Sequence, residues 1–323
     1  MTSREERLRI LASSLGFTAC GITDLAPSRY AAELDQWLAA GHGGTMRYLH
    51  RQAARRKEPA RIVAGARRAV VVLDNYAPPP EPDRATDEPT VQVAKYARGA
   101  DYHHVTLERL EQLAEWLRAE GATIARPYAD AGSVPERELA QRAGLGWIGK
   151  NTMLLRPGVG SLFFIGSVLT DLDLAVDAPF ALDHCGTCTR CLDACPTAAI
   201  VAPQILDATL CISYLTIEQR GPIPEEFVPL AEGWAFGCDI CNDVCPWNER
   251  FAEPTNISAF LPRPAPDRTD PDYFERMDEE EFGRLFADSP LSRPGLAGMR
   301  RNWGAAFPGS EKREVGGEKK PTD

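Results

Sequence analysis

The chain has 323 residues, which predicts about two domains, and its 44% hydrophobic and 25% charged residues are ordinary for a globular protein. Its formal net charge of −10 argues against a general nucleic-acid binder. The longest nearly apolar run, residues 161–169, is too short for a membrane helix, and the charged amino terminus does not fit a signal peptide, so we expect a cytoplasmic protein with no membrane association.

Helices and strands alternate along the first half of the predicted structure. A capping box formed by Ser3 and Glu6 predicts the start of the first helix. Apolar periodicity predicts further helices over residues 29–40, 103–120 and 134–143, and strands over residues 18–23, 69–73 and 122–126. Residues 77–89 read as a loop, and residues 152–155 and 162–170 as strands paired around a turn at 156–160. These elements predict the α+β class.

Eight of the nine cysteines fall in a short, ordered segment. The first run is Cys185-x-x-Cys188-x-x-Cys191-x-x-x-Cys195, and the second is Cys238-x-x-Cys241-x-x-x-Cys245, with Cys211 between the runs. Proline follows the last cysteine of each run, as in bacterial proteins that hold two iron–sulfur clusters, where the fourth cysteine of a run binds the other cluster.

This pattern predicts two [4Fe–4S] clusters with exchanged ligands. One set is Cys185, Cys188, Cys191 and Cys245, and the other is Cys195, Cys211, Cys238 and Cys241. Two alternatives stay open, namely a pair of four-cysteine zinc sites and a disulfide framework. The ninth cysteine, Cys20, stands in an apolar stretch and is expected to be a buried thiol.

Basic residues gather between positions 47 and 68. They are Arg47, Arg51, Arg55, Arg56, Lys57, Arg61, Arg67 and Arg68. Such a strip could hold phosphate groups, or it could be the solvated face of a helix.

A glycine pattern, Gly144-x-Gly146-x-x-Gly149, spells the dinucleotide fingerprint in the wrong context. The fingerprint follows a strand and opens a helix, whereas this segment follows a predicted helix and leads into a strand. Close approach of the backbone to a large flat cofactor is the better explanation for these glycines.

The order of motifs resembles that of the epoxyqueuosine reductases, which are cobalamin-dependent. The matching segments are YARGADYH (96–103), YADAGSVPER (128–137), AGLGWIGKN (143–151), the two cysteine runs and CISYLTI (211–217). The resemblance implies an α+β, nitroreductase-like cobalamin-binding domain beside a bacterial two-[4Fe–4S] ferredoxin-like module. It also implies the substrate, epoxyqueuosine at the wobble position of tRNA, which is reduced to queuosine.

The resemblance assigns roles to residues. It makes Asp130 the proton donor, with a pKa raised by burial against the corrin, whereas the sequence alone favours Asp130 as the cap of a helix near residue 134. Further residues are expected at the cofactor: Arg56, Tyr96, Asp101 and His103 around the pocket, Ser213 at the cofactor tail, and Gly146, Gly149 and Lys150 on the other side of the corrin. Arg56 and Lys150 could equally be surface charges.

Four segments are expected from this resemblance and from the composition. They are a cobalamin-binding α+β catalytic domain (1–175), the two-cluster module (176–250), a carboxy-terminal wrap with one helix near 277–286 (251–308), and a disordered tail (309–323). We expect a monomer that binds tRNA and receives electrons from a low-potential donor. The rival hypotheses are a reductive dehalogenase, a ferredoxin-type electron carrier and a zinc-binding structural protein.

Overall fold

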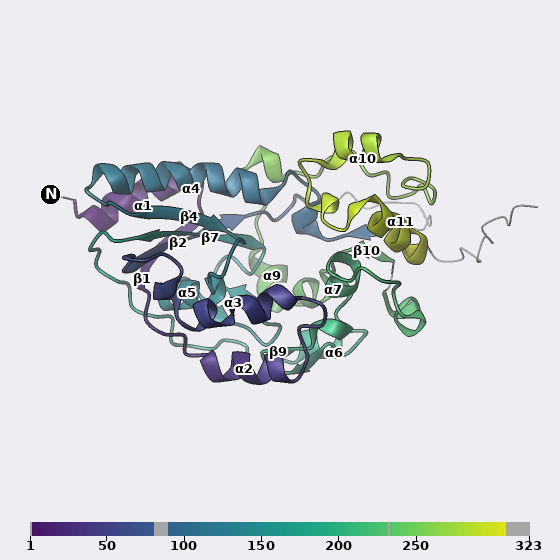
Figure 1. Cartoon of the computed structure of the whole chain (residues 1–323), viewed down its shortest axis with the longest axis horizontal. Helices are drawn as coiled ribbons and strands as arrows, with labels where there is room; N and C mark the ends of the chain where they lie inside the picture. The colour runs from purple at the N-terminus through teal and green to yellow at the C-terminus, as the bar shows by residue number, and fades with distance from the viewer. Residues whose placement is uncertain (1, 81–89, 232, 308–323) are drawn as a thin grey trace, which may run out of the picture.

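A four-stranded antiparallel sheet lies between two layers of helices in the amino-terminal part of the chain (Figure 1). The computed structural model describes residues 2–80, 90–231 and 233–307. The sheet has the order β1-β2-β7-β4, and short two-stranded pairs lie outside it. The strands are β1 (Ala19–Asp24), β2 (Arg68–Asn75), β3 (Gln92–Val93), β4 (Ala125–Ala129), β5 (Trp147–Ile148), β6 (Leu154–Leu155), β7 (Phe163–Thr170), β8 (Ile200–Ala202), β9 (Ile205–Leu206) and β10 (Trp234–Phe236).

Helices cover both faces of this sheet and build most of the remaining chain. They are α1 (Arg4–Ser14), α2 (Ala31–Ala39), α3 (Arg47–Lys57), α4 (Tyr102–Ala119), α5 (Glu136–Arg142), α6 (Arg190–Asp193), α7 (Ile212–Ile217), α8 (Ile240–Asp243), α9 (Pro246–Phe251), α10 (Glu279–Phe286) and α11 (Gly295–Ala306). Figure 1 shows α1 and α4 on one side of the sheet, and α5, α3 and α2 on the other. Among the residues that the structure describes, no helix combines the length and hydropathy needed to span a membrane.

The central strand β2 explains why the sheet needs two helical layers. Val70 and Val72 pack into the core beneath α1 and α4, whereas Val71 and Leu73 pack into the core on the α5 side. All four side chains are fully buried. Because successive residues of a strand point to opposite faces, an unbroken apolar run within a strand requires cover on both sides.

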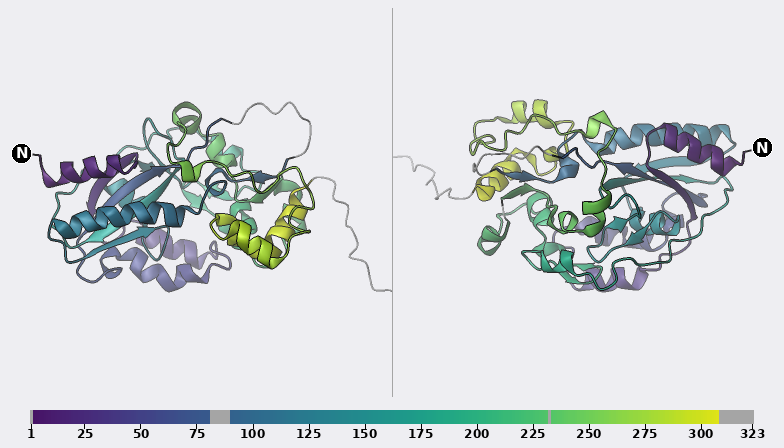
Figure 2. Two further views of the ribbon diagram at one scale, coloured as in Figure 1. Left: turned by 90° about the horizontal axis from the view of Figure 1, so that it is seen from above. Right: turned by 180° about the vertical axis from the view of Figure 1, so that it is seen from behind.

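The carboxy-terminal helices form a separate core with two strands of the central region. Residues of α10 and α11 pack with β3 and β10 around Phe274, Met299 and Trp303. Figure 2 shows these yellow helices at the end of the molecule opposite the amino terminus. The sequence prediction missed α11 because its glycines, Gly298 and Gly304, disfavour helix, and burial of one apolar face outweighs that preference.

Most of the predicted elements are confirmed, with small shifts at their ends. Ser3 caps α1 by accepting a hydrogen bond from the Glu6 backbone N–H at 3.1 Å. The strand expected at 122–126 lies at Ala125–Ala129, because the turn after α4 takes up the first residues. The predicted loop lies partly at 81–89, and the predicted disordered tail lies at 309–323; both segments are outside the described residues.

The prediction that residues 152–155 pair with 162–170 is wrong. A single bridge between Arg156 and Gly160 closes the turn as expected. Beyond it the two segments separate, since β6 pairs with β5 and β7 pairs with β2 and β4. The apolar strand β7 buries more surface as an interior strand of the main sheet than it could in a hairpin.

Candidate functional site

One cavity of about 690 Å³ brings together the predicted proton donor and five of the predicted cofactor-binding residues. We call it the Asp130 cavity. These six lining residues are Arg56, Tyr96, Asp101, His103, Asp130 and Ser213. They come from α3, the segment before α4, the start of α4, the loop after β4, and α7. Residues far apart in sequence therefore meet at one site, as expected of a cofactor or substrate pocket.

Asp130 projects from the loop between β4 and α5. Its backbone is left-handed, with a φ of 46°, and its side chain is largely exposed to the cavity. The Tyr102 hydroxyl donates a short hydrogen bond to Asp130 Oδ2, and His103 Nε2 lies 3.9 Å from the same oxygen. The alternative role of Asp130 as a helix cap is wrong, because α5 begins after Pro135 without a side-chain cap.

Glu136 and Tyr102 hold Asp130 in this position from two sides. The Asp130 backbone N–H donates to Glu136 Oε1 at 2.8 Å. Burial, together with the nearby Asp130 charge, raises the pKa of Glu136 well above its usual value. The same two causes raise the pKa of Tyr102, so its hydroxyl keeps its proton and acts as a donor.

His103 and Asp101 form a second polar pair at the start of α4. Asp101 caps α4: its Oδ1 accepts a hydrogen bond from the His103 backbone N–H at 3.0 Å. The same oxygen lies 2.7 Å from His103 Nδ1. The hydrogen bond to the Asp101 carboxylate raises the pKa of His103 above its usual value. The pair thus favours a charged imidazolium directed at the Asp130 carboxylate.

Replacing Asp101 with asparagine should lower the pKa of His103, because the carboxylate that stabilises the imidazolium is removed. NMR titration of ¹³C-labelled histidines measures this change. In the wild type, the pair stabilises the fold at pH values below the usual histidine pKa of about 6.5. That contribution is lost as pH rises through the higher pKa of folded His103. An unchanged midpoint in the variant would show that Asp101 does not set the charge of His103.

Arg56 shows that the Asp130 cavity has room for a further polar partner. Its Nη2 donates to the Gly132 carbonyl and to Gln52 Oε1, each at 3.2 Å, while its Nε is buried without a partner among the described residues. A buried guanidinium nitrogen without an acceptor is costly unless a ligand supplies one. The volume of the cavity and this orphan donor fit a large polar cofactor.

A second cavity of about 330 Å³ is lined by Cys185, Cys188, Cys191 and Cys245. We call it the Cys185 cavity. Cys245 comes from the second cysteine run, so the exchange of the fourth cysteine between the runs is present in the geometry. The cysteines are free thiols rather than disulfides. Within the described ranges, no group of three histidine, cysteine or acidic side chains converges closely enough to hold a single metal ion.

The remaining four cysteines lie close to one another. The thiols of Cys211 and Cys195 contribute to the raised pKa of Cys241, which reaches about 12 chiefly because the thiol is buried. Those of Cys241 and Cys211 likewise add to the pKa of Cys238, which burial raises most. At Cys211 burial also raises the pKa, but backbone N–H groups of Ser213 and Tyr214 oppose it by favouring the thiolate. Buried thiols with N–H donors around them fit a negatively charged iron–sulfur cluster, whose sulfurs accept hydrogen bonds.

The two cysteine sets are neighbours, and one of them borders the Asp130 cavity. Helices α6 and α8, which each carry a cysteine, pack on one another. Cys211 lines the Asp130 cavity together with Ser213 and Tyr96. The geometry therefore links the Cys185 cavity, through the second cysteine set, to Asp130.

Gly146, Gly149 and Lys150 lie away from the Asp130 cavity, contrary to the expectation that they border the corrin. Lys150 lines the Cys185 cavity, where its Nζ donates to the Gly186 and Cys188 carbonyls at 2.7 and 2.8 Å. A Cβ at Gly149 would lie 3.5 Å from Cys185 Sγ and would clash with the Leu155 side chain at 2.4 Å. The absent side chains thus allow close packing beside the cysteines rather than beside Asp130.

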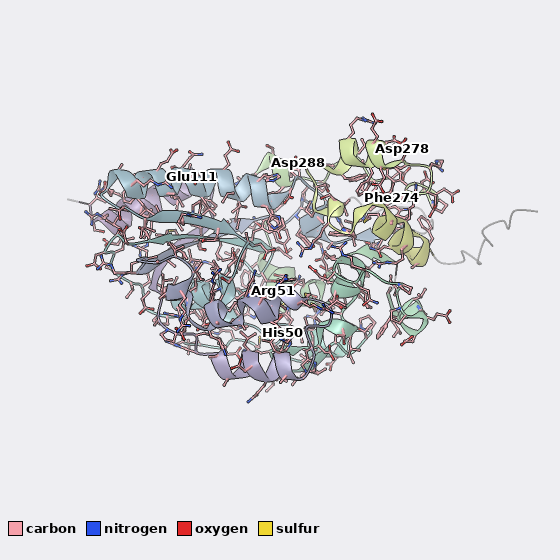
Figure 3. All side chains as sticks on the ribbon, in the orientation of Figure 1. His50, Arg51, Glu111, Phe274, Asp278 and Asp288 are labelled. Atoms are coloured by element: carbon pink, nitrogen blue, oxygen red, sulfur yellow. The ribbon has the colours of Figure 1, made fainter. Side chains whose placement is uncertain are left out.

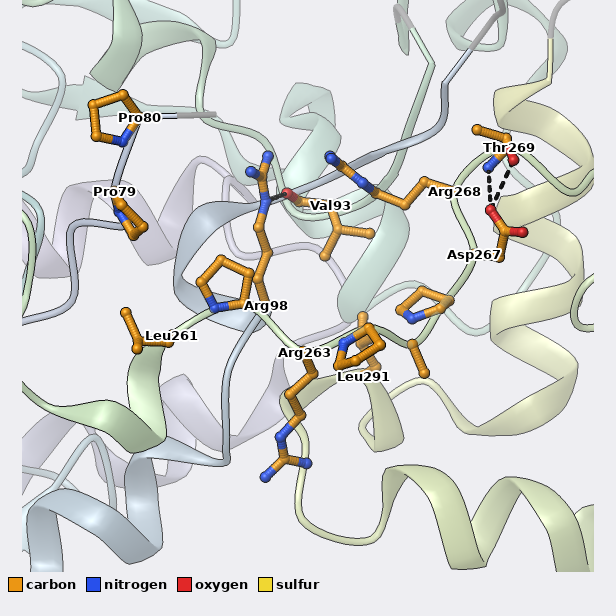
Figure 4. Close-up of a pocket in the computed structure, with 14 residues that line it drawn as sticks. Pro79, Pro80, Val93, Arg98, Leu261, Arg263, Asp267, Arg268, Thr269 and Leu291 are labelled. Atoms are coloured by element: carbon orange, nitrogen blue, oxygen red, sulfur yellow. Dashed lines mark hydrogen bonds between the residues drawn. The ribbon is translucent and has the colours of Figure 1, made fainter. Parts of the chain in front are cut away.

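A third large cavity, about 680 Å³, holds none of the predicted site residues (Figure 4). Arg98, Arg263 and Arg268 lie in its wall, and structural contacts hold Arg98 and Arg263 there. The Arg98 Nε donates to the Val93 carbonyl at 2.8 Å, and the Arg263 guanidinium pairs with Asp288 at 2.6 Å. These contacts explain the arginines as supports of the carboxy-terminal segment.

The sequence prediction missed several residues that shape the Asp130 cavity. Tyr102 and Glu136 lie inside the quoted motifs, so their proximity to Asp130 in sequence was a usable signal. Tyr48 and Arg293 also line the cavity. Arg293 comes from the carboxy-terminal segment, where no local pattern connects it to the site.

Comparisons with known proteins identify the family. A family model described as "Epoxyqueuosine reductase QueG, DUF1730" matches residues 56–131, and one described as "4Fe-4S double cluster binding domain" matches residues 184–248. An epoxyqueuosine reductase of Cyclobacterium marinum is 41% identical over 307 residues, which cover 94% of this chain and 97% of the relative. An epoxyqueuosine reductase of Pseudomonas aeruginosa is 44% identical over 292 residues, which cover 89% of this chain and 80% of the relative.

Solved structures agree with the sequence comparisons. A crystal structure of epoxyqueuosine reductase with a tRNA-TYR epoxyqueuosine-modified tRNA stem loop superposes with a TM-score of 0.86 at 28% identity, covering 94% of this chain and 80% of that one. The enzyme from Bacillus subtilis, with its catalytic loop swung out of the active site, superposes with a TM-score of 0.83 at 28% identity and the same coverage. The chain therefore belongs to the epoxyqueuosine reductase family.

Proposed function

We propose that this chain reduces epoxyqueuosine to queuosine at the wobble position of tRNA, using cobalamin and two [4Fe–4S] clusters. One observation carries the proposal: the Asp130 carboxylate and the cluster cysteine Cys211 face the same cavity. A proton donor and an electron source therefore meet where a substrate can bind. Relatives named epoxyqueuosine reductase, which match nearly the whole chain, support the choice of substrate.

The reaction defines what the protein must supply. Conversion of an epoxide to an alkene consumes two electrons and two protons and releases water. Bound cobalamin supplies a cobalt centre that can gather two electrons and open the strained ring. The oxygen of the opening ring is a poor leaving group until it is protonated, so the protein must place an acid beside it.

Asp130 is the acid in this proposal. Since the Tyr102 hydroxyl donates to Oδ2, the other oxygen, Oδ1, is left to carry the proton that reaches the substrate. The N–H bond to Glu136 fixes the left-handed backbone of Asp130 and aims its side chain into the cavity. A bound corrinoid would exclude water from the carboxyl group, so that its proton passes to the substrate rather than to solvent.

The remaining site residues hold the cofactors in this proposal. Arg56, Tyr96 and Ser213 would contact cobalamin in the Asp130 cavity, and the orphan Nε of Arg56 would bind one of its polar groups. The first cluster takes its ligands from Cys185, Cys188, Cys191 and Cys245, and the second takes them from Cys195, Cys211, Cys238 and Cys241. Lys150 and Gly149 shape the loop around the first cluster.

Helix α3 offers a basic face for the tRNA. Arg51 and Arg55 are exposed on this helix, whereas Arg56 turns toward the Asp130 cavity, and Figure 3 labels Arg51 and His50 on the outer surface. Tyr48 and Gln52 of the same helix line that cavity. Phosphates of an anticodon stem would therefore lie near α3 when the wobble nucleoside enters the site.

Reversing the charges in the double variant Arg51→Glu/Arg55→Glu should weaken tRNA binding about tenfold or more, because two phosphate contacts are lost. The slope of log K against log salt concentration should become shallower by about two. Fluorescence anisotropy with a labelled tRNA stem loop at several salt concentrations measures both quantities. The Arg7→Glu variant, on α1 in the opposite helical layer, provides the control (Figure 1). Equal affinities of wild type and double variant would place the tRNA elsewhere.

The alternative hypotheses predict different chemistry. A ferredoxin-type carrier needs neither the Asp130 cavity nor its polar cluster, and a reductive dehalogenase is not supported by relatives that match nearly the whole chain as epoxyqueuosine reductases. Zinc does not account for the match to a double 4Fe–4S domain. We also propose that the protein works in the cytoplasm with its tRNA substrate, as a monomer that receives electrons from a low-potential donor.

Mass spectrometry of tRNA nucleosides tests this function in the cell. A strain that lacks the gene should accumulate epoxyqueuosine, and a plasmid copy of the gene should restore queuosine. A plasmid carrying the Asp130→Asn change should restore none. Normal queuosine in the deletion strain, in the absence of a second reductase gene, would contradict the proposal.

A further inference from the structure

The walls of the Cys185 cavity carry positive charge only. Among the described residues that line it, the charged side chains are Lys150, Arg190 and Arg250, accompanied by His184, and none is a carboxylate. This is notable in a chain with a formal net charge of −10. The basic wall therefore marks a local region that differs in sign from the protein as a whole.

The three cations are not equivalent. Lys150 is tied to the carbonyls of the cysteine loop, and Arg190 pairs with Glu249 at the rim. Arg250 stacks on Phe251, with its guanidinium 5.2 Å from the ring centre, and has no ion pair among the described residues. Its charge is thus available to a molecule that approaches the cavity.

Aromatic and aliphatic side chains surround this cation. Trp247 and Phe251 stack on one another at 5.5 Å between ring centres and line the cavity. Leu155 lines the same cavity. An apolar centre with an arginine and a polar rim is the composition of a protein interface, and small interfaces of this kind serve transient redox partners.

The position of the cavity indicates the direction of electron flow. The second cysteine set borders the Asp130 cavity through Cys211, whereas none of the first set, among the described residues, lines that cavity. The first set lies instead in a cavity whose rim residues, Arg190, Pro246 and Arg250, are exposed to solvent. Electrons from another protein would therefore arrive at the first cluster and continue through the second.

We propose that the exposed rim of the Cys185 cavity is the docking site of an acidic one-electron carrier protein, with Arg250 as its main charged contact. The inference rests on the proposed function, since it requires that the cysteines hold clusters. In each encounter the reduced carrier loses one electron and the first cluster gains it, and no bond or proton changes at this site. Two encounters supply the two electrons that one turnover consumes.

Stopped-flow reduction of the clusters tests this proposal without tRNA. The holoprotein with both clusters is mixed anaerobically with a reduced acidic plant-type [2Fe–2S] ferredoxin, and cluster absorbance is followed. Arg250→Glu should lower the second-order rate constant about tenfold or more at low salt, and the difference should shrink as salt rises. Arg250→Lys should retain most of the wild-type rate.

Two controls make the result specific. Reduced methyl viologen, a small cation that needs no docking site, should reduce the clusters of Arg250→Glu within about twofold of the wild-type rate. Arg284→Glu makes the same charge change on α10, which Figure 1 shows at the top of the molecule away from α6 and α9, and should behave as wild type with both donors.

Several results would overturn the proposal. One is equal rates of cluster reduction by ferredoxin in the wild type and in Arg250→Glu. Another is that Arg250→Glu slows cluster reduction by ferredoxin and by methyl viologen to the same extent. A third is that ferredoxin fails to reduce wild-type clusters that methyl viologen does reduce. A loss of tRNA affinity in Arg250→Glu, with an unchanged ferredoxin rate, would assign the surface to tRNA. Normal cluster reduction without queuosine formation would count against the proposed function and not against the docking site.

Discussion

Replacing Asp130 with asparagine is expected to lower kcat by about 10² to 10⁴, the contribution of a well-placed general acid. Asparagine keeps the size of the side chain and can still accept the Tyr102 hydrogen bond, but it has no acidic proton to give. Both clusters and the affinity for tRNA should be unchanged, because no cysteine and no basic residue is altered. Single-turnover conversion of an epoxyqueuosine-containing stem loop measures the chemical step directly.

The Asp130→Asn result is interpretable only beside a matched control. Asp173→Asn removes the same charge from an exposed side chain that pairs with Arg68, away from the Asp130 cavity, and should retain wild-type turnover. Turnover in Asp130→Asn within a few-fold of wild type would remove Asp130 from the mechanism and leave it a structural loop residue.

The second large effect concerns the exchange of ligands between the cysteine runs. Cys245→Ala should behave as Cys185→Ala does, although the two residues belong to different runs, because both line one cavity. Each variant should lose about half of the iron, that is, one [4Fe–4S] cluster of two, and turnover should fall below detection because electrons no longer reach the site. Iron analysis and EPR of the anaerobically reduced protein report the cluster that remains.

Substitutions in the other set make this test discriminating. Cys211→Ala should also lose about half of the iron, but the surviving EPR signal should be that of the first cluster. Cys20→Ala should retain both clusters, because Cys20 lies on β1, partly buried against the core beneath α1 and α4 and outside both cysteine sets. Identical residual signals in Cys245→Ala and Cys211→Ala would contradict the exchange.

The cysteine grouping could be derived from sequence because iron–sulfur ligation imposes fixed local spacings. Three cysteines at intervals of three residues bring their sulfurs to one point through a tight turn, so Cys185, Cys188 and Cys191 were recognisable as one set. The structure adds Cys245 to the same cavity, as the proline after it predicted. Strand β2 was equally accessible, since an unbroken apolar run has no stable place except between two layers.

Other features depend on contacts that no local pattern encodes. The glycine segment was expected on the other side of the corrin, yet Gly149 packs against Cys185 and Leu155. The Glu136 contact with the Asp130 backbone arises from the left-handed turn at Asp130, a conformation that a non-glycine residue adopts only when its surroundings hold it.

The error in the predicted strand pairing also comes from contacts that no local pattern encodes. A strand such as β7 can pair with any neighbour of the correct length and polarity, so only the whole sheet decides its partners. Arg293 lies in the Asp130 cavity because α10 and α11 pack beside it. Helix α11 forms because its tertiary contacts outweigh the low helix propensity of its glycines. Long-range burial, rather than local propensity, determined each of these features.

The most direct test of the account uses purified holoprotein, cobalamin, a chemical reductant and a tRNA stem loop containing epoxyqueuosine. Nucleoside mass spectrometry should detect queuosine when cobalamin and both clusters are present. It should detect no queuosine when either cofactor is left out. Full conversion without cobalamin, or no conversion by protein that holds both clusters and cobalamin, would contradict the account.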